Sequence, residues 1–486
     1  MDHSPTEINP LTTDSSISAN LINLIFDPLF ICSENGQLIP NIIKKWEILS
    51  EGLVWKLELR KDVFFHDQYR LKTSDIKFTY DYLRLKLSRG HSHYLDSVKD
   101  IVVDDDDHVS IFLKKADNDF LTALCEFGIA PQHLLEKTSD FSKFNSLPIG
   151  SGPYRFVSQS SDSIVLKKNE NYFSKFDSLD RIDVKVYKDQ KSVLNHLIAG
   201  DVEMTFLTNP EDYGALEKIP SIKVYDNWYP RLYLLGFNNS HHLFSEPDIR
   251  KALNFAINKQ SLIKSVAMNK VFLPRGTLRP DSQEYESYAG NDGIAYNPKE
   301  ALKILKKNGW SDRNGDFILD KKGKPFEFST VTFDGENLAL QTLKNIQTQL
   351  RDVGVLMKIE TLPLDQYINR VMRKSDFDAY IINLVSRPYY NNDFVFWHSS
   401  QIKDGMNFSH YQNKKVDQLL EEMRSEVDER KRNEMNVNLQ NELIASPPGV
   451  FLFWRKMPIA VNTRFTGVPE KRMQNLRDLI YFKPAH

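Results

Sequence analysis

The segment from Glu336 to Leu364, ENLALQTLKNIQTQLRDVGVLMKIETLPL, indicates the fold class most clearly. In its first half, apolar residues recur three or four positions apart, which is typical of an amphipathic helix. Gly354 is the predicted stop of this helix, and the apolar residues that follow it predict a strand. A helix that leads directly into a strand indicates an α/β fold.

The first part of the chain shows the same mixture of elements. The segment from Leu53 to Arg60, LVWKLELR, alternates apolar and polar residues and predicts a half-buried strand. The next segment, KTSDIKFTYDYLRLKL, predicts a helix with Ser74 as its N-cap. The four aspartates from Asp104 to Asp107 predict a hairpin turn between two strands.

Length and composition restrict the class of protein. A chain of 486 residues is too long for one compact core, so we expect two or three domains. The hydrophobic share of 41% and the charged share of 26% are those of an ordinary soluble globular protein. A net charge of −2, with Lys and Arg spread along the chain, gives no support for nucleic-acid binding. No apolar run reaches the length of a membrane span, and the start at Met1 lacks the features of a signal peptide.

Catalytic and metal motifs are weak in this sequence. Ser151 lies in GSG without the spacing of a nucleophile elbow, which favours a glycine-rich turn. There is no HExxH motif, and His91 and His93 have no obvious third ligand. We therefore expect no catalytic residue, no metal site and no cofactor, and we favour a binding protein. The two cysteines, Cys32 and Cys125, would pair only in an oxidising compartment, and the sequence alone does not place them together.

Several stretches in order resemble one known family, the peptide/nickel-type (family 5) solute-binding proteins of ABC importers. The stretches that carry this resemblance are LIPNIIKKWEILSEGLVWKLELRKDVFFHD (38–67), LKTSDIKFTYDYL (71–83), GSGPYRFV (150–157), LIAGDVEM (197–204), LLGFNNSHHLFSEPDIRKALNFAINKQSLI (234–263) and YNPKEALKILKKNGW (296–310). The resemblance extends from about Asn9 to about Tyr481. One departure is Gln68, which stands where the family usually has glycine after the His-Asp pair.

The resemblance implies an α/β architecture of the type II periplasmic-binding-protein kind, with two lobes and an extra domain inserted in the first. We expect lobe I to comprise 1–39, 146–234 and 459–486, the inserted domain 40–145, and lobe II 235–458. The chain should pass between the lobes near 234–237 and near 453–460.

The same resemblance implies a receptor rather than an enzyme. Such a protein encloses a small peptide-like or anionic solute between its lobes and delivers it to an ABC permease. We expect a monomer located in the periplasm or elsewhere outside the cytoplasmic membrane, with its leader removed and with or without a lipid anchor.

The resemblance also places a candidate ligand site in lobe II. In peptide-binding relatives an aspartate pairs with the α-amino group of the peptide. Counting from Phe377-Asp378 without a gap, this position is Arg387. An arginine there would repel an ammonium and attract a carboxylate or phosphate. Our hypothesis is a ligand with an anionic group held by Arg387, with aromatic walls from Tyr389, Tyr390 and Trp397.

Two other interpretations of this region stay open. Arg387 could pair with a structural carboxylate, or a shifted register could give Asp393 the role of the aspartate and restore peptide binding. In the first lobe, Phe26 and Asp27 are candidates for the cleft, with the end of a core strand as the alternative. Tyr229, Trp454 and Arg455 are weaker candidates.

Two other functions compete with that of a solute receptor. An enzyme or a regulator that borrowed the fold would need a catalytic site or a DNA-binding helix pair, and the sequence offers neither. The stronger alternative is a receptor of the same fold for a metal chelate of the nickel type, in which Arg387 and either His398 or His410 would contact the chelate.

Overall fold

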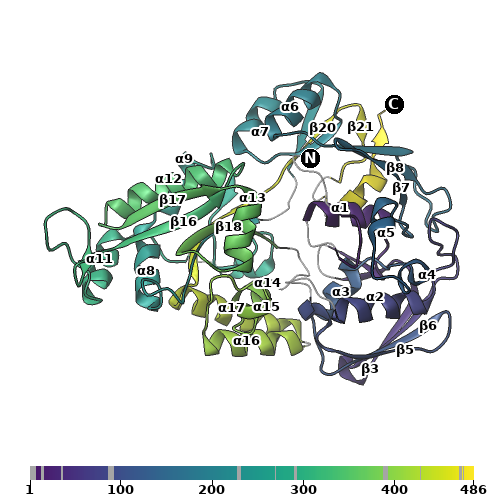
Figure 1. The fold of residues 1–486 in the computed structure, drawn as a ribbon, viewed down its shortest axis with the longest axis horizontal. Helices are drawn as coiled ribbons and strands as arrows, with labels where there is room; N and C mark the ends of the chain where they lie inside the picture. The colour runs from purple at the N-terminus through teal and green to yellow at the C-terminus, as the bar shows by residue number, and fades with distance from the viewer. Residues whose placement is uncertain are drawn as a thin grey trace.

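The computed structural model describes residues 7–12, 16–33, 37–85, 92–226, 231–268, 270–288, 293–386, 392–426, 428–469, 473 and 476–485. Figure 1 shows two masses of mixed helix and strand lying side by side. We call the mass built around residues 231–455 lobe II and the remainder lobe I. Within the described ranges, no helix is both long and apolar enough to cross a membrane.

Lobe II is built on one mixed sheet of six strands. In spatial order these are β13 (Val271–Phe272), β19 (Gly449–Arg455), β12 (Arg231–Phe237), β18 (Ala379–Val385), β16 (Glu327–Phe333) and β17 (Leu356–Leu362). β12 pairs antiparallel with both neighbours, whereas β16 pairs parallel with β17 and β18. The helices of this lobe are α8 (Pro247–Ala256), α9 (Lys259–Ser265), α10 (Gln283–Ser287), α11 (Pro298–Lys307), α12 (Asn337–Arg351), α13 (Leu364–Tyr367), α14 (Asn392–Trp397), α15 (Gln401–Asp404), α16 (Lys414–Ser425) and α17 (Glu429–Ala445).

Both faces of this sheet are covered. Along β12, Tyr233, Leu235 and Phe237 enter a core that also contains residues of α8 and α12. Leu232 and Leu234 point the other way, into a core with residues of α14, α16 and α17. Successive side chains of a strand alternate between faces, so one continuous apolar strand supplies both cores.

Among the described residues, lobe I contains three sheets of three or four strands, besides two small two-stranded ones. The three larger sheets are β7 (Tyr154–Gln159), β8 (Ser163–Lys168) and β9 (Arg181–Lys185); β10 (Met204–Phe206), β20 (Ile459–Asn462) and β11 (Ile222–Tyr225); and β3 (Ile43–Leu49), β4 (Val54–Leu59), β6 (His108–Leu113) and β5 (Val98–Val103). Its helices include α1 (Ser16–Ile25), α2 (Thr73–Leu85), α3 (Phe120–Glu126), α4 (Gln132–Leu135), α5 (Ser142–Ser146), α6 (Gln190–Ala199) and α7 (Pro210–Leu216). The four-stranded sheet lies within the predicted inserted domain. The buried residues of this four-stranded sheet belong to the same hydrophobic core as the rest of lobe I. The exact domain boundaries stay a prediction.

Most of the predicted helices, strands and turns are confirmed. The opening stretch forms α12 and β17, with Gly354 between them at φ +75°. Leu53–Arg60 contains β4, and the four aspartates connect β5 to β6. The predicted cap is wrong, because α2 begins at Thr73 and Ser74 is inside the helix. The carboxylate of Asp75 instead accepts a hydrogen bond from the backbone N–H of Lys72.

The first predicted passage between the lobes is also wrong. Residues 234–237 lie inside β12, a central strand of the lobe II sheet, so the chain has already entered lobe II. The passage comes earlier, between Tyr225 of β11 and Arg231 of β12. The second passage lies between Arg455 of β19 and Ile459 of β20, within the predicted range.

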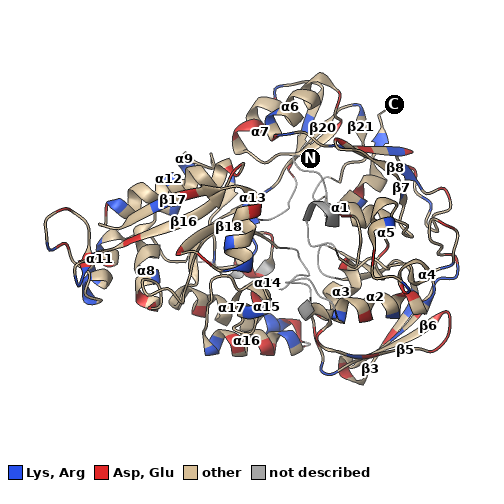
Figure 2. Ribbon diagram, viewed as in Figure 1, with Lys and Arg blue, Asp and Glu red and all other residues tan. Residues whose placement is uncertain are grey.

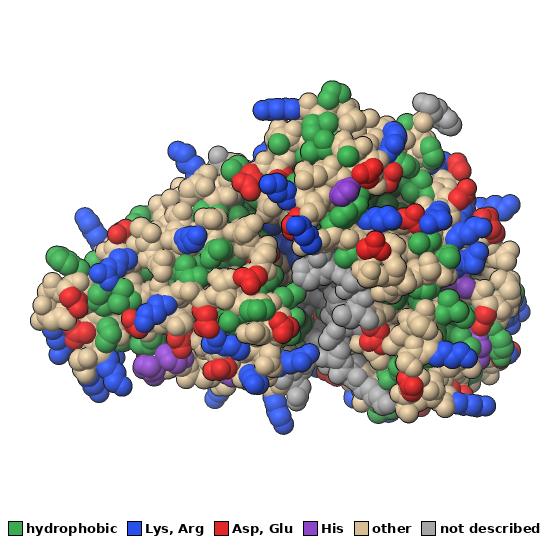
Figure 3. All heavy atoms as spheres, turned by 45° about the horizontal axis from the view of Figure 1, so that its top comes forward, with side chains coloured by type: hydrophobic (Ala, Val, Ile, Leu, Met, Phe, Trp, Pro, Cys, Tyr) green, Lys and Arg blue, Asp and Glu red, His purple; other side chains and the backbone are tan. Residues whose placement is uncertain are grey.

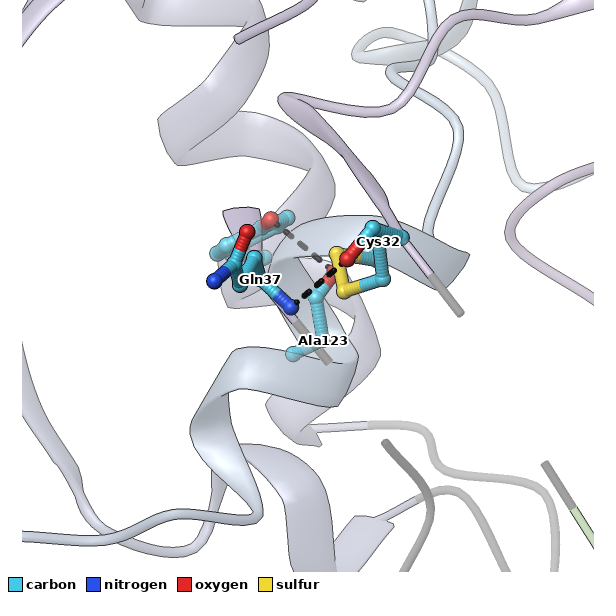
Figure 4. Close-up of a disulfide and its surroundings, with 6 residues drawn as sticks. Cys32, Gln37 and Ala123 are labelled. Carbon is cyan, nitrogen blue, oxygen red and sulfur yellow. Dashed lines mark hydrogen bonds between the residues drawn. A yellow bond between two sulfur atoms is a disulfide. The ribbon is translucent and has the colours of Figure 1, made fainter. Parts of the chain in front are cut away.

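A disulfide joins Cys32 of β1 (Phe30–Cys32) to Cys125 of α3, with a Cα–Cα distance of 5.7 Å (Figure 4). It answers the question of pairing that the sequence left open. The bond ties the beginning of lobe I to the predicted inserted domain.

Candidate functional site

The two passages between the lobes lie side by side. β11 and β20 are neighbours in a sheet of lobe I, and β12 and β19, which continue from them across the gap, are neighbours in lobe II. Two adjacent connections of this kind are typical of hinges in proteins whose domains close around a ligand. A ligand held between the lobes would therefore lie beside this hinge.

A buried arginine links the two sides of the hinge. Arg455, the last residue of β19, donates hydrogen bonds to the carbonyl of Leu207 in lobe I and to the hydroxyl of Tyr233 in lobe II. The Tyr233 hydroxyl in turn donates to Glu336 at 2.7 Å. Burial raises the pKa of Tyr233, so this hydroxyl keeps its proton and remains a donor. Sequence analysis made Arg455 only a weaker candidate, because it lies near the predicted second passage between the lobes.

Asp393 is the predicted site residue whose surroundings the structure describes best. It lies in the first turn of α14, where the hydroxyl of Thr277 donates to its Oδ2 at 2.8 Å and the indole of Trp397 donates to its Oδ1 at 3.1 Å. Both of these donors are neutral. Burial raises the pKa of Asp393 to about 6, although hydrogen bonds, that from Thr277 first, act in the opposite direction.

Sequence reasoning missed Thr277 and Gln440, the two residues that hold the carboxylate of Asp393 in place. The backbone N–H of Thr277 donates to the side-chain oxygen of Gln440, which is fully buried in α17. The Thr277 hydroxyl, which donates its proton to Asp393, lies 3.1 Å from the same oxygen. Thr277 and Gln440 are 163 positions apart, and neither belongs to a motif. The support orients the Thr277 hydroxyl and thereby the carboxylate.

The structure places Trp397 and Trp454 in the core of lobe II. Trp397 is 1% exposed and packs edge-on against Tyr411 and Phe451. Trp454 is equally buried, and its indole N–H has no hydrogen-bond partner among the described residues. Trp397 therefore positions Asp393 through its indole nitrogen, and direct contact of either tryptophan with a ligand stays a prediction.

In lobe I the structure supports the alternative of a core position. Phe26 is fully buried. The carboxylate of Asp27 is also fully buried, and Arg477 binds it at 2.7 Å. Further hydrogen bonds reach Asp27 from Ser151 and Tyr172. This network joins segments of lobe I that lie 450 positions apart, which gives Asp27 a structural role and leaves ligand contact a prediction.

Four predicted site residues lie outside the described residues: Arg387, Tyr389, Tyr390 and Tyr229. The two histidines of the metal-chelate alternative are described. His398 is buried, stacks on Phe394 and lies 3.3 Å from Glu421. His410 contacts the hydroxyl of Ser240. Within the described residues, no group of three or more His, Cys, Asp or Glu side chains could hold a metal ion.

Charged side chains of both signs are mixed over the parts of the molecule that the structure describes. Figure 2 shows Lys, Arg, Asp and Glu interspersed over both lobes. On the face drawn in Figure 3, the coloured side chains of the two signs are likewise scattered over both masses. This mixture agrees with the small net charge of −2.

Comparison with known proteins gives consistent matches along the whole chain. The family model described as bacterial extracellular solute-binding proteins, family 5 (middle), matches residues 37–406. The chain is 27% identical over 488 residues to the oligopeptide-binding protein AppA of Bacillus subtilis (strain 168), covering 97% of this chain and 89% of the relative. It is 24% identical to the di/tripeptide-binding protein 1 of Pseudomonas aeruginosa (strain UCBPP-PA14), covering 92% and 86%.

Two solved structures extend the comparison. The structure of AppA from Bacillus subtilis in complex with a nonapeptide is similar with a TM-score of 0.90 at 26% identity, covering 100% of this chain and 98% of the other. NikZ from Campylobacter jejuni in complex with Ni(L-His) is similar with a TM-score of 0.88 at 25% identity, covering 99% and 98%. The two-lobed fold is thus shared by relatives crystallised with different ligands.

Proposed function

The chain belongs to the bacterial extracellular solute-binding proteins, family 5, and from this premise we propose that it is the peptide receptor of an ABC importer. It binds a peptide outside the cytoplasmic membrane, closes its two lobes around it and presents it to the permease. The observation that carries the proposal is the match to a peptide-binding relative over 97% of the chain, together with a TM-score of 0.90 to its nonapeptide complex.

Asp393 is our candidate for the acceptor of the ligand's α-ammonium group. Its carboxylate accepts hydrogen bonds from a hydroxyl and an indole N–H, which fix its direction. Its raised pKa means that the ionised form is poorly solvated in the structure, so a cation placed against it would be strongly favoured. This assignment uses the shifted register and replaces an anionic ligand on Arg387 as the preferred interpretation.

The fold provides the means of enclosure. The paired passages β11–β12 and β19–β20 form the hinge, and Arg455 contacts groups on both sides of it. A ligand that touches both lobes stabilises the closed form by its differential affinity for that form. No bond is made or broken in this cycle, so the proposed function needs no catalytic residue.

We further propose a location outside the cytoplasmic membrane and a monomeric state. Disulfides persist in oxidising compartments, and the bond between Cys32 and Cys125 supports such a location. The permease and any lipid anchor follow from the family and are parts of the same proposal.

A metal-chelate receptor is the second candidate, because the NikZ complex with Ni(L-His) shares the fold with a TM-score of 0.88. A chelate brings most of its own metal ligands, so such a receptor would not need a metal site made by protein residues alone. The candidate contacts are Arg387, which lies outside the described residues, and either His398 or His410.

Native mass spectrometry of the protein, purified without refolding, tests this proposal. A mixed envelope of bound peptides that is lost in Asp393→Asn and kept in Asp376→Asn would support the peptide receptor. Asp376 is the matched control, because it is an exposed aspartate of the same lobe. A single mass carrying a metal isotope pattern would instead favour the chelate receptor, and a bound acidic solute would restore the interpretation based on Arg387.

A further inference from the structure

The two lobes meet a second time at the end of α16, the helix at the lower edge of Figure 1, whereas β20 of the hinge lies near the top. There, the segment Asp117–Asn118–Asp119, which precedes α3 in lobe I, contacts Arg424, the second-last residue of α16. The partners are 307 positions apart. These residues therefore connect lobe II to the predicted inserted domain and not to the hinge strands.

Asn118 binds the carboxyl-terminal end of α16. Its backbone N–H donates to the carbonyl of Arg424 at 2.8 Å. Its side-chain amide nitrogen lies 3.2, 3.1 and 2.8 Å from the carbonyl oxygens of Met423, Arg424 and Glu426. The last carbonyls of a helix have no partner within the helix, so one asparagine of lobe I satisfies groups that lobe II leaves open.

Arg424 turns its guanidinium toward lobe I. It is 5% exposed and binds Asp117 through two nitrogens, at 2.6 and 3.2 Å. Its Nε also lies 2.9 Å from Oδ2 of Asp119, within ion-pair distance although this oxygen accepts no hydrogen bond. The guanidinium carbon lies 4.4 Å from the ring centre of Phe394, which holds it in place from the lobe II side.

We propose that Asp117, Asn118, Asp119 and Arg424 form an interlobe clasp that holds the lobes together with or without a ligand and so controls when a bound ligand leaves. The proposal rests on the proposed function only in its last clause, because the clasp itself acts on lobe closure. It adds a closing contact that does not touch the ligand.

The chemistry of the clasp suits a contact that must open and close. Burying charges costs hydration free energy that offsets most of their mutual attraction, so an intact buried ion pair adds little net stability. Removing one partner is different, because it leaves the other charge buried without compensation. The closed form should therefore tolerate repeated opening but not the loss of Arg424.

The charge balance of the clasp also makes closure sensitive to pH. Arg424 faces Asp117 and Asp119, with Asp96 and Lys115 also acting on this group. Burial raises the pKa of Asp119 well above its usual range. The closed form thus binds a proton more tightly than an open form in which Asp119 is hydrated. Closure is favoured at acidic pH and weakens as the pH rises through the raised pKa of Asp119.

Hydrogen exchange and small-angle scattering of the ligand-free protein test the clasp. The Asn118 amide should be protected in the wild type, because it donates across the interface. In Arg424→Gln we expect the closed-to-open ratio to fall at least about a hundredfold, with lost protection at Asn118 and a larger radius of gyration. Asn118→Ala, which leaves the charges intact, should show a smaller change of the same kind.

Two further variants serve as a control for the loss of an arginine and as a test of the pH dependence. Arg370→Gln removes an ion pair with Glu360 that lies wholly within lobe II and should change neither readout. Asp119→Asn imitates the protonated carboxyl and should keep the lobes closed at pH 6 and pH 8.5 alike, whereas the wild type opens toward the higher pH.

An unprotected Asn118 amide in the ligand-free wild type at pH 6, or equal radii of gyration in the wild type and Arg424→Gln at that pH, would overturn the clasp. Both readouts are independent of ligand, so they separate this outcome from a failure of the peptide proposal. The native mass spectrum alone tests the peptide proposal.

Discussion

Acidification should weaken peptide binding through Asp393. The pKa of this carboxyl is about 6 in the structure, raised from its usual value by burial. A peptide ammonium binds the ionised carboxylate, so peptide binding must first remove a proton from every molecule in which Asp393 is protonated. The affinity for the peptide is therefore constant well above pH 6 and falls as the pH drops through 6.

The magnitude follows from the same pKa. At pH 7 about a tenth of the carboxyls carry a proton, and at pH 5 about nine tenths do, so the dissociation constant should rise about tenfold between these values. At pH 7, Asp393→Asn should cost about 2–5 kcal/mol of binding free energy, the usual range for truncating one side of a desolvated charge pair.

Isothermal titration calorimetry from pH 5 to pH 8, with a peptide identified in the native mass spectrum, measures both effects. Asp393→Asn should bind weakly and show a flat profile between pH 5 and pH 7, and Asp376→Asn should behave as the wild type. An N-acetylated copy of the peptide, which has no ammonium, should bind weakly at every pH. A wild-type affinity that stays constant from pH 7 to pH 5, or full affinity in Asp393→Asn, would refute the assignment of Asp393.

Three further predictions concern stability. Replacing Cys32 and Cys125 by serine should destabilise lobe I by up to about 4.7 kcal/mol, the chain-entropy value for a separation of 93 residues, as measured by urea unfolding. Arg477→Met should cost about 3–5 kcal/mol, because it leaves the buried carboxylate of Asp27 without its cation; thermal unfolding reports the loss. Gly449→Ala should destabilise lobe II, because its new Cβ would lie 2.3 Å from the carbonyl oxygen of Leu235 on the neighbouring strand; circular dichroism during heating measures this change.

Matched controls separate these effects from the general cost of mutation. Reduced wild type should reproduce the serine variant. Arg464→Met breaks an exposed pair with Glu203 and should change stability by less than about 1 kcal/mol. Gly214→Ala places a Cβ in open space within α7 and should be neutral or mildly stabilising. Equal losses of stability in Arg464→Met and Arg477→Met would contradict the role of the buried ion pair. An unchanged melting temperature in Gly449→Ala would contradict the close approach of the two strands. A serine variant as stable as the oxidised protein would contradict stabilisation by the disulfide.

The local elements were predictable from the sequence. Helical spacing and a glycine predicted α12 and β17, alternation predicted β4, and four aspartates predicted the turn before β6. These signals are reliable because helix periodicity, strand alternation and turn chemistry depend on neighbours a few positions away. The family, with its two-lobed fold, was likewise readable from the order of its motifs.

The pairing of residues far apart in the sequence became visible in the folded chain. Cys32 and Cys125, Asp27 and Arg477, and Asp117 and Arg424 are separated by 93, 450 and 307 positions. No local pattern marks such partners, because each pair exists only after whole lobes have packed. The early passage into lobe II was misplaced for a related reason. An apolar run such as β12 looks alike whether it crosses between lobes or lies at the centre of a sheet, and only burial on both faces distinguishes the two.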